Sequence, residues 1–215
     1  MQHSKFYKDD GIIVIPDVVR RYLDEHLLPE LQNMQATNPK LLVVFSGGNA
    51  MGKSTISGRL AADLQALVLN NDRTRHLLAT KWPSMHRDEV NRYMWQYMLE
   101  LYQRLDTLTP NGLVVRDGVI DWYYDKIFPI FEAQGYRIFI IAFDLSRQKR
   151  IDLVTSRGDT HVAKVDGMLE MIDDLIVYEK LFRAQYEPDI TLTDDNLFDH
   201  DRVVQAVQKR LSQLT

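Results

Sequence analysis

Residues 41–55 read LLVVFSGGNAMGKST, and this stretch decides the fold that we expect. Its first part, residues 41–45, is a continuous apolar run rich in branched side chains, which is typical of a strand covered on both faces in a parallel sheet. A helical spacing of apolar side chains begins after Ser54. Between strand and helix lies the pattern G-x-x-x-x-G-K-[ST], whose fixed positions are Gly47, Gly52, Lys53 and Ser54.

This pattern predicts a loop that binds phosphate groups. Glycines let the backbone curl so that successive N–H groups face one anion, and the following helix points its positive end the same way. Lys53 would reach the outer phosphates of ATP, and the Ser54 hydroxyl would bind Mg²⁺, which prefers oxygen ligands. The alternative is a chance glycine-rich turn, but the flanking strand and helix favour the phosphate loop. The predicted nucleotide-binding residues are Gly47, Gly48, Asn49, Ala50, Met51, Gly52, Lys53, Ser54 and Thr55.

Strands and helices alternate along most of the chain. A first helix is expected over residues 17–34, with Asp17 as its cap, and helical patterns fill most segments between the later strands. Four further strands are predicted at residues 66–69, 113–115, 137–143 and 189–192. This alternation predicts one α/β domain built on a parallel sheet with helices on both faces.

Side chains that follow the predicted strands are candidates for the site, because ligands of open parallel sheets bind at the carboxyl ends of strands. Asp72 could accept a proton from an acceptor hydroxyl; its alternative role is to cap the next helix. Arg75 could hold an acidic group of the acceptor in a bidentate fork. Asp117 could hold Mg²⁺ as a Walker-B aspartate does, or it could be a turn residue before Gly118.

Two arginines follow the fourth predicted strand. Arg150 and Arg157 lie seven positions apart and would share one face of a helix. On a mobile lid, such cations could neutralise charge on a transferring phosphoryl group; the alternative is a solvated basic helix face. Arg116 is interpreted as a solvated or sheet-edge charge and receives no role.

Composition limits the function classes. The chain has 215 residues, a formal net charge of −4 and no cysteine. Disulfides, thiolate metal sites and thiol catalysis are therefore excluded. The acidic balance argues against a protein that coats nucleic acid, without excluding a basic groove. With no apolar run long enough for a membrane helix and no signal segment at its start, the chain is expected to be soluble and cytoplasmic.

With these motifs, the chain resembles the P-loop kinases, especially the group of zeta toxins, polynucleotide 5′-hydroxyl kinases and small AAA-type kinases. The resemblance begins near Lys40 and is carried by residues 47–55, 72–75, 114–118, 150–158 and 189–195. It implies the P-loop NTPase fold, a five-stranded sheet in the order 2-3-1-4-5 and a helical lid. Residues 40–215 would form the kinase domain, and residues 1–39 an N-terminal extension with a helix packed on it.

The resemblance also implies roles for single residues. Asp72 would be the catalytic base, Arg75 would hold the acceptor, and Arg150 and Arg157 would be the lid arginines. ATP and Mg²⁺ would be the cofactors, and the loop at residues 193–195 would lie by the adenine. The Asp117-Gly118 pair begins like that of nucleoside monophosphate kinases but lacks the Pro-Arg that follows in adenylate kinases.

Three functions remain open. The first is a kinase for a hydroxyl of a nucleoside, sugar nucleotide or other small metabolite. The second is a nucleoside monophosphate kinase, whose acceptor is already ionised and needs no base. The third is an ATP-binding switch with slow hydrolysis.

Overall fold

The computed structural model describes residues 13–34, 38–159 and 164–214, which form parts of two compact units. The helical unit comprises Met1–Met34 and Asn71–Thr109, and the sheet unit comprises Gln35–Asn70 and Pro110–Thr215. The first twelve residues of the expected N-terminal extension lie outside the described residues. The division of the chain at residues 39 and 40 stays a prediction.

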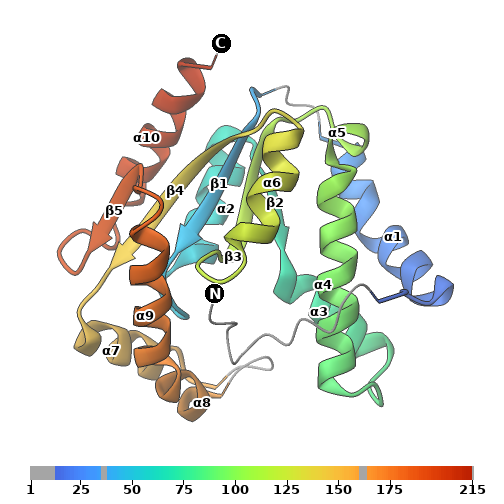
Figure 1. Ribbon diagram of the computed structural model, residues 1–215, viewed down its shortest axis with the longest axis horizontal. Coiled ribbons are helices and arrows are strands. Elements are labelled where there is room, and N and C mark those ends of the chain that lie inside the picture. Colours follow the sequence, from blue (N-terminus) through green and yellow to red (C-terminus); the bar gives the residue numbers. More distant parts are fainter. Residues whose placement is uncertain (1–12, 35–37, 160–163, 215) are drawn as a thin grey trace. The chain divides into compact units, whose positions relative to one another are not determined.

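The sheet unit is built on five parallel strands in the order β2-β3-β1-β4-β5, which confirms the predicted fold (Figure 1). Every residue of the central strand β1 is buried, as its unbroken apolar run predicts. Apolar side chains of β1, β3 and β4 form one core with α2 and α10 on one face. The strands are β1 (Leu41–Ser46), β2 (Leu67–Asn70), β3 (Leu113–Val119), β4 (Arg137–Asp144) and β5 (Ile190–Thr193).

Helices cover both faces of this sheet, with α6 in front of it and α2 behind it in Figure 1. On the α6 side, rings from α6 and α9 pack together, among them Tyr124, Phe128 and Phe182. The helices of the sheet unit are α2 (Lys53–Leu64), α6 (Tyr124–Ala133), α7 (Arg147–Arg157), α8 (Val165–Glu170), α9 (Ile172–Arg183) and α10 (His200–Ser212). Both layers are thus in place as the alternating pattern predicts.

The helical unit contains α1 (Asp17–Gln32), α3 (Asn71–Lys81), α4 (Arg87–Gln103) and α5 (Leu105–Leu108). Its helices are joined by polar contacts such as the Tyr97 hydroxyl, which donates to Asp24 at 2.9 Å. The prediction that Asp17 caps α1 is wrong: Pro16 is the N-cap, Asp17 is the first helical residue, and no side chain caps this end. A short break separates α3, which ends at Lys81, from α4, which begins at Arg87.

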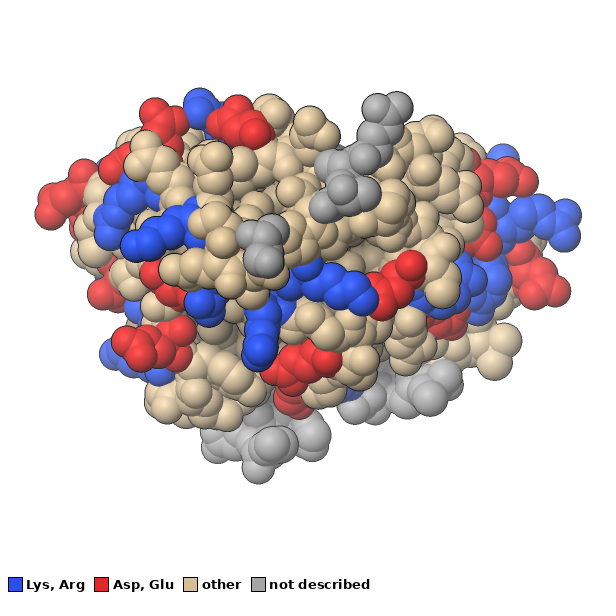
Figure 2. All heavy atoms as spheres, turned by 90° about the horizontal axis from the view of Figure 1, so that it is seen from above, with Lys and Arg blue, Asp and Glu red and all other residues tan. Residues whose placement is uncertain are grey.

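The surface shown in Figure 2 carries both signs of charge. Basic and acidic side chains are interspersed on this face, so its described residues form no extended patch of one sign. Within the described part of the chain, no helix has both the length and the apolar character that crossing a bilayer requires.

Candidate active site

The phosphate loop between β1 and α2 is curled as its glycines predict. Gly47, Ala50 and Gly52 have positive φ angles of 144°, 62° and 82°. A side chain at Gly47 would also collide with Phe143, whose Cβ lies 2.9 Å from the position of an added Cβ. Left-handed backbone next to ordinary backbone turns successive N–H groups inward, which is the geometry of an anion-binding nest.

The first turn of α2 leaves backbone donors for an anion. Gly52 is the N-cap and has no side chain that could cap the helix. The N–H groups of Thr55 and Ile56 donate to the Gly52 carbonyl, at 3.0 and 3.1 Å. Those of Lys53 and Ser54 lie nearer the helix end, where a bound phosphate can accept from them and benefits from the helix dipole.

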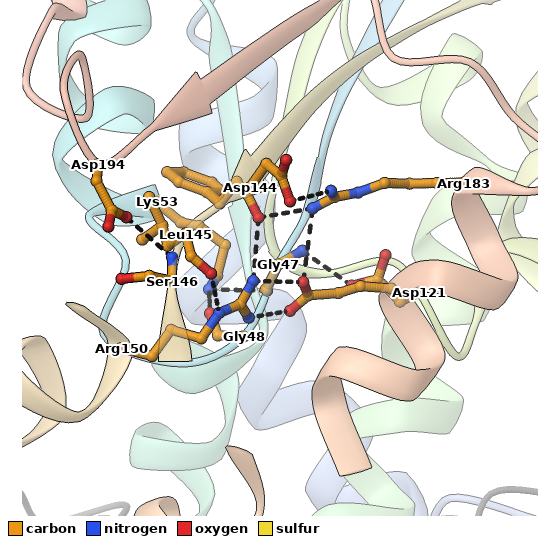
Figure 3. Close-up of polar contacts among 12 residues, drawn as sticks. Gly47, Gly48, Lys53, Asp121, Asp144, Leu145, Ser146, Arg150, Arg183 and Asp194 are labelled. Carbon is orange, nitrogen blue, oxygen red and sulfur yellow. Dashed lines mark hydrogen bonds and ion pairs between the residues drawn. The ribbon is translucent and has the colours of Figure 1, made fainter. Parts of the chain in front are cut away.

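Lys53 lies inside the loop that it follows. Its Nζ donates to the carbonyl oxygen of Gly48 and, at 3.4 Å, to that of Gly47 (Figure 3). Burial lowers the pKa of Lys53 to about 8, against the raising effect of Asp117 and Asp121. The loop therefore holds a buried cation that a bound polyphosphate would stabilise.

Asp117 lies in the electrostatic neighbourhood of Lys53. It is buried near the carboxyl end of β3, accepts a hydrogen bond from Asn70 at 2.7 Å, and exerts the largest charge effect on the pKa of Lys53. Ser54 is exposed at the start of α2. Among the described residues, no three acidic or histidine side chains gather into a metal cluster. Binding of Mg²⁺ by Ser54 and Asp117, together with nucleotide phosphates, stays a prediction.

Asp121 is a site residue that the sequence reading missed. It is buried after β3, and its Oδ2 accepts the N–H of Gly47 at 2.9 Å (Figure 3). Burial raises the pKa of Asp121 to about 6. The turn that places it is fixed by the Ile120 N–H, which donates to the Phe45 carbonyl at 3.0 Å. No sequence motif signals this position, because it depends on how the chain turns back toward β1.

The two predicted lid arginines have different environments, although both lie on α7. Arg150 is only 3% exposed and forms a bidentate ion pair with Glu179 of α9, at 2.6 and 2.8 Å. It also donates to the Leu145 carbonyl at 2.9 Å. Arg157 is exposed at the end of α7, yet its charge still helps to lower the pKa of Lys53. Of the two, Arg157 is the one available to a ligand, and a catalytic role for Arg150 stays a prediction.

Arg183 of α9 belongs to the same charged cluster. Its guanidinium donates to Asp144 at 3.0 Å and to the Phe143 carbonyl at 2.6 Å, and it lies 3.5 Å from Glu179 (Figure 3). These contacts tie α9 to the carboxyl end of β4. They also give Glu179 a second cationic neighbour besides Arg150.

Helices α7–α9 lie against the phosphate loop. Side chains of these helices, including Arg150, Met168 and Leu175, line a small cavity together with Gly48 and Asn49 of the loop. Leu175 is so near that its Cδ1 would lie 3.1 Å from a Cβ added at Gly48. The segment predicted as a lid is therefore next to the site where it would act, and its movement stays a prediction.

Asp72 and Arg75 lie in the first turns of α3, in the helical unit. Asp72 follows the last residue of β2 by two positions. Arg75 pairs with Asp72 through Nη1, and its Nε donates to Asn91 of α4 at 2.8 Å. The structure thus brings the predicted base and the predicted acceptor-binding arginine together, and their roles toward a substrate stay predictions.

The interpretation of Arg116 as a solvated or sheet-edge charge is wrong. Its strand, β3, lies between β2 and β1 in the sheet, and the residue is only 1% exposed. Burial of Arg116 could not be predicted from the sequence, because a lone charged side chain in an apolar strand usually faces solvent.

A parallel sheet in this order, with a phosphate loop between β1 and α2, defines the P-loop NTPase fold. No protein-family model matches the chain, and no curated protein matches it. Solved structures do match, at low sequence identity. A chain of the PezAT chromosomal toxin–antitoxin system of Streptococcus pneumoniae is 13% identical with a TM-score of 0.58, covering 95% of this chain and all of its own length.

Two further structures support the same fold. A Chloroflexus aurantiacus protein, described provisionally as a kinase, is 16% identical with a TM-score of 0.54 and covers 84% of this chain and 100% of its own. A gluconokinase from Sinorhizobium meliloti is 14% identical with a TM-score of 0.50, covering 83% of this chain and 97% of its own. The chain therefore shares the fold of P-loop kinases.

Proposed function

We propose that this chain is a P-loop kinase that transfers the γ-phosphate of ATP to a hydroxyl group of a small molecule. One observation carries the proposal: the curled loop at the head of α2 holds the buried side chain of Lys53, whose Nζ donates to carbonyl oxygens of the loop. Burial lowers the pKa of Lys53 to about 8, and the charge of Asp117 opposes this shift. Mg²⁺ would supply charge neutralisation between the phosphates. The backbone amides of the loop and Lys53 would bind the phosphates. Arg157, whose charge affects the pKa of Lys53, would help to neutralise the transferring phosphoryl group.

The proposed acceptor is a hydroxyl because a carboxylate follows β2. Asp72 would orient the hydroxyl and receive its proton, which a phosphate acceptor would not need. Arg75, bound to Asp72 in this structure, would exchange that contact for an acidic group of the acceptor. Membership of the zeta toxin and polynucleotide kinase group, and a location in the cytoplasm, belong to the same proposal.

Transfer from γ-labelled ATP to a metabolite library tests this function. Lys53→Ala should remove transfer, whereas the matched change Lys209→Ala, at an exposed lysine of α10, should not. If wild-type protein releases only inorganic phosphate whatever acceptor is added, the kinase proposal fails and an ATP-driven switch replaces it. Transfer that Lys53→Ala leaves unchanged would remove the phosphate loop from the reaction.

Asp72→Asn tests the nature of the acceptor. We expect transfer to a hydroxyl to fall at least ~100-fold, which is within the range of general acid–base groups. Asp88→Asn is the matched control, because Asp88 is also an exposed aspartate in the first turn of a helix. Full turnover in Asp72→Asn would favour an acceptor that is already ionised, such as a nucleoside monophosphate.

A further inference from the structure

Arg116 is a buried cation that no described carboxylate neutralises. It is only 1% exposed and ranks first among the largest fully buried side chains. Its Nη1 donates to the Val119 carbonyl at 2.9 Å, and its Nε is buried without a hydrogen-bond partner among the described residues. The edge of the guanidinium formed by Nε and Nη2 is therefore buried and makes no hydrogen bond with the described residues.

Such an arrangement is costly for the folded protein. A guanidinium keeps its charge in proteins, so it cannot relieve its burial by losing a proton. An unpaired buried charge costs several kcal/mol in general. The same chain treats Arg150 differently: that guanidinium is comparably buried but binds both oxygens of Glu179. The missing anion at Arg116 therefore needs an explanation.

The surroundings of Arg116 are shaped around its planar group. A Cβ added at Gly118 would lie 3.3 Å from Nη1, so the glycine leaves space against one part of the guanidinium. The ring of Tyr123 lies with its centroid 5.9 Å from Cζ. Gly118, Val119 and Tyr123 are all partly exposed, so residues around the buried guanidinium reach the protein surface.

The position of Arg116 in the sheet also points to a ligand. It precedes Asp117 in β3 and reaches toward Val119, the last residue of that strand. Ligands of open parallel sheets bind at the carboxyl ends of the strands. A carboxylate or phosphate group matches the unpaired edge formed by Nε and Nη2, because a guanidinium binds two oxygens side by side.

We propose that Arg116 binds an anionic group of the phosphate acceptor, either a carboxylate or a phosphate. The inference rests on the proposed kinase function and narrows its substrate class to hydroxyl compounds that carry a negative charge. The acceptor would supply the counter-charge that the described protein residues do not provide.

Calorimetric titration tests the anion site without turnover. Protein saturated with Mg²⁺ and the non-hydrolysable ATP analogue AMPPNP, which occupies the phosphate loop, is titrated with succinate in one arm and inorganic phosphate in the other. Wild-type protein should bind one of the two anions, and the responding arm identifies the group. Arg116→Met should bind at least about 10-fold more weakly, since a hydrogen-bonded charge is lost. Arg137→Met, at an exposed arginine of β4, should bind like wild type.

Thermal unfolding separates this role from a structural one. Removal of an uncompensated buried charge should leave the melting temperature of Arg116→Met equal to or above that of wild type. Equal anion binding by wild type and Arg116→Met overturns the proposal, and so does a wild type that binds neither anion. If Arg116→Met does not fold, Arg116→Lys serves instead, because it keeps the charge but loses the bidentate geometry of the guanidinium. Unchanged anion binding in Arg116→Lys would also overturn the proposal.

Transfer assays then connect the site to the reaction. With an anionic acceptor, Arg116→Met should raise the acceptor KM about 10- to 100-fold and leave the ATP KM unchanged. An unchanged acceptor KM overturns the proposal. A wild type that transfers phosphate to nothing would refute the kinase function, whereas the titration would still decide whether Arg116 binds an anion.

Discussion

Glu179→Ala should strongly destabilise the sheet unit, because it leaves Arg150 buried and without a carboxylate. The two side chains are 3% and 4% exposed, and both guanidinium nitrogens bind carboxylate oxygens at 2.6 and 2.8 Å. Removing one partner of such a pair costs about 3–5 kcal/mol. In a domain of this size that corresponds to a fall in melting temperature of about 6–20 °C.

The reverse change should cost less. In Arg150→Ala, Glu179 still has Arg183 at 3.5 Å, so its charge keeps one cationic neighbour. In Glu179→Ala, Arg150 retains only carbonyl oxygens, those of Leu145 at 2.9 Å and Phe143 at 3.3 Å. We therefore expect the double variant to be more stable than the sum of the two single losses predicts, since neither charge is then stranded.

Calorimetric melts of the two single variants and the double variant measure this difference. Asp173→Ala is the control, because it breaks an exposed ion pair with Arg147 on the same helices. Exposed pairs contribute about 0–1 kcal/mol, so this variant should melt within a few degrees of wild type. A Glu179→Ala melting temperature no lower than that of Asp173→Ala would refute the reasoning, and Arg150 would again be free for catalysis.

Three further changes test separate parts of the structure. Asp121→Asn should raise the melting temperature at pH 7 and lose this advantage as the pH falls from 6 toward 4. Burial raises the folded-state pKa of Asp121 to about 6, so the ionised side chain opposes folding fully above pH 6 and progressively less as the pH falls to 4. An advantage that persists at pH 4 would contradict this explanation. Gly112→Ala should lower the free energy of unfolding by about 1–3 kcal/mol, because its Cβ would lie 2.3 Å from a backbone oxygen. Gly58→Ala is the control: its Cβ would have no atom within 4 Å in a helix, so this variant should be as stable as wild type or more stable. Urea unfolding measures both. Arg157→Ala should reduce the rate of phosphate transfer about 100-fold, whereas Arg147→Ala, at another exposed arginine of α7, should leave it unchanged. Equal transfer rates in the two variants would exclude Arg157 from the reaction.

Local patterns were sufficient for most of the fold. The apolar run before Ser46 and the glycines after it predicted β1, the loop and α2, because neighbouring residues decide all three. The boundaries of β3 were harder. Its apolar run covers only residues 113–115 and predicted a strand that ends at Asp117 and Gly118, whereas the strand continues to Val119. Pairing of Asn70 in β2 with Asp117 extends β3, and a local sequence pattern does not show which strand will pair with it.

The charged residues of the site show where sequence reasoning ends. Arg150 and Arg157 follow the same pattern in sequence, but only Arg150 meets Glu179, which lies on another helix. Asp121 contacts Gly47 across a turn that no spacing rule describes. In each case the environment of a charge is set by a partner far along the chain, so propensity and periodicity carry no information about it.

The order of the strands also has a consequence for the chain as it emerges from the ribosome. β1 hydrogen-bonds with β3 and β4, and it does not pair with β2, the next strand to be made. At ribosomal speeds of about 5–20 residues per second, roughly 70 more residues must be added before β3 exists, a wait of about 3–14 s. During that interval the run of five apolar residues in β1 has no partner strand at either edge, so the unfinished chain exposes a segment of the kind that promotes aggregation.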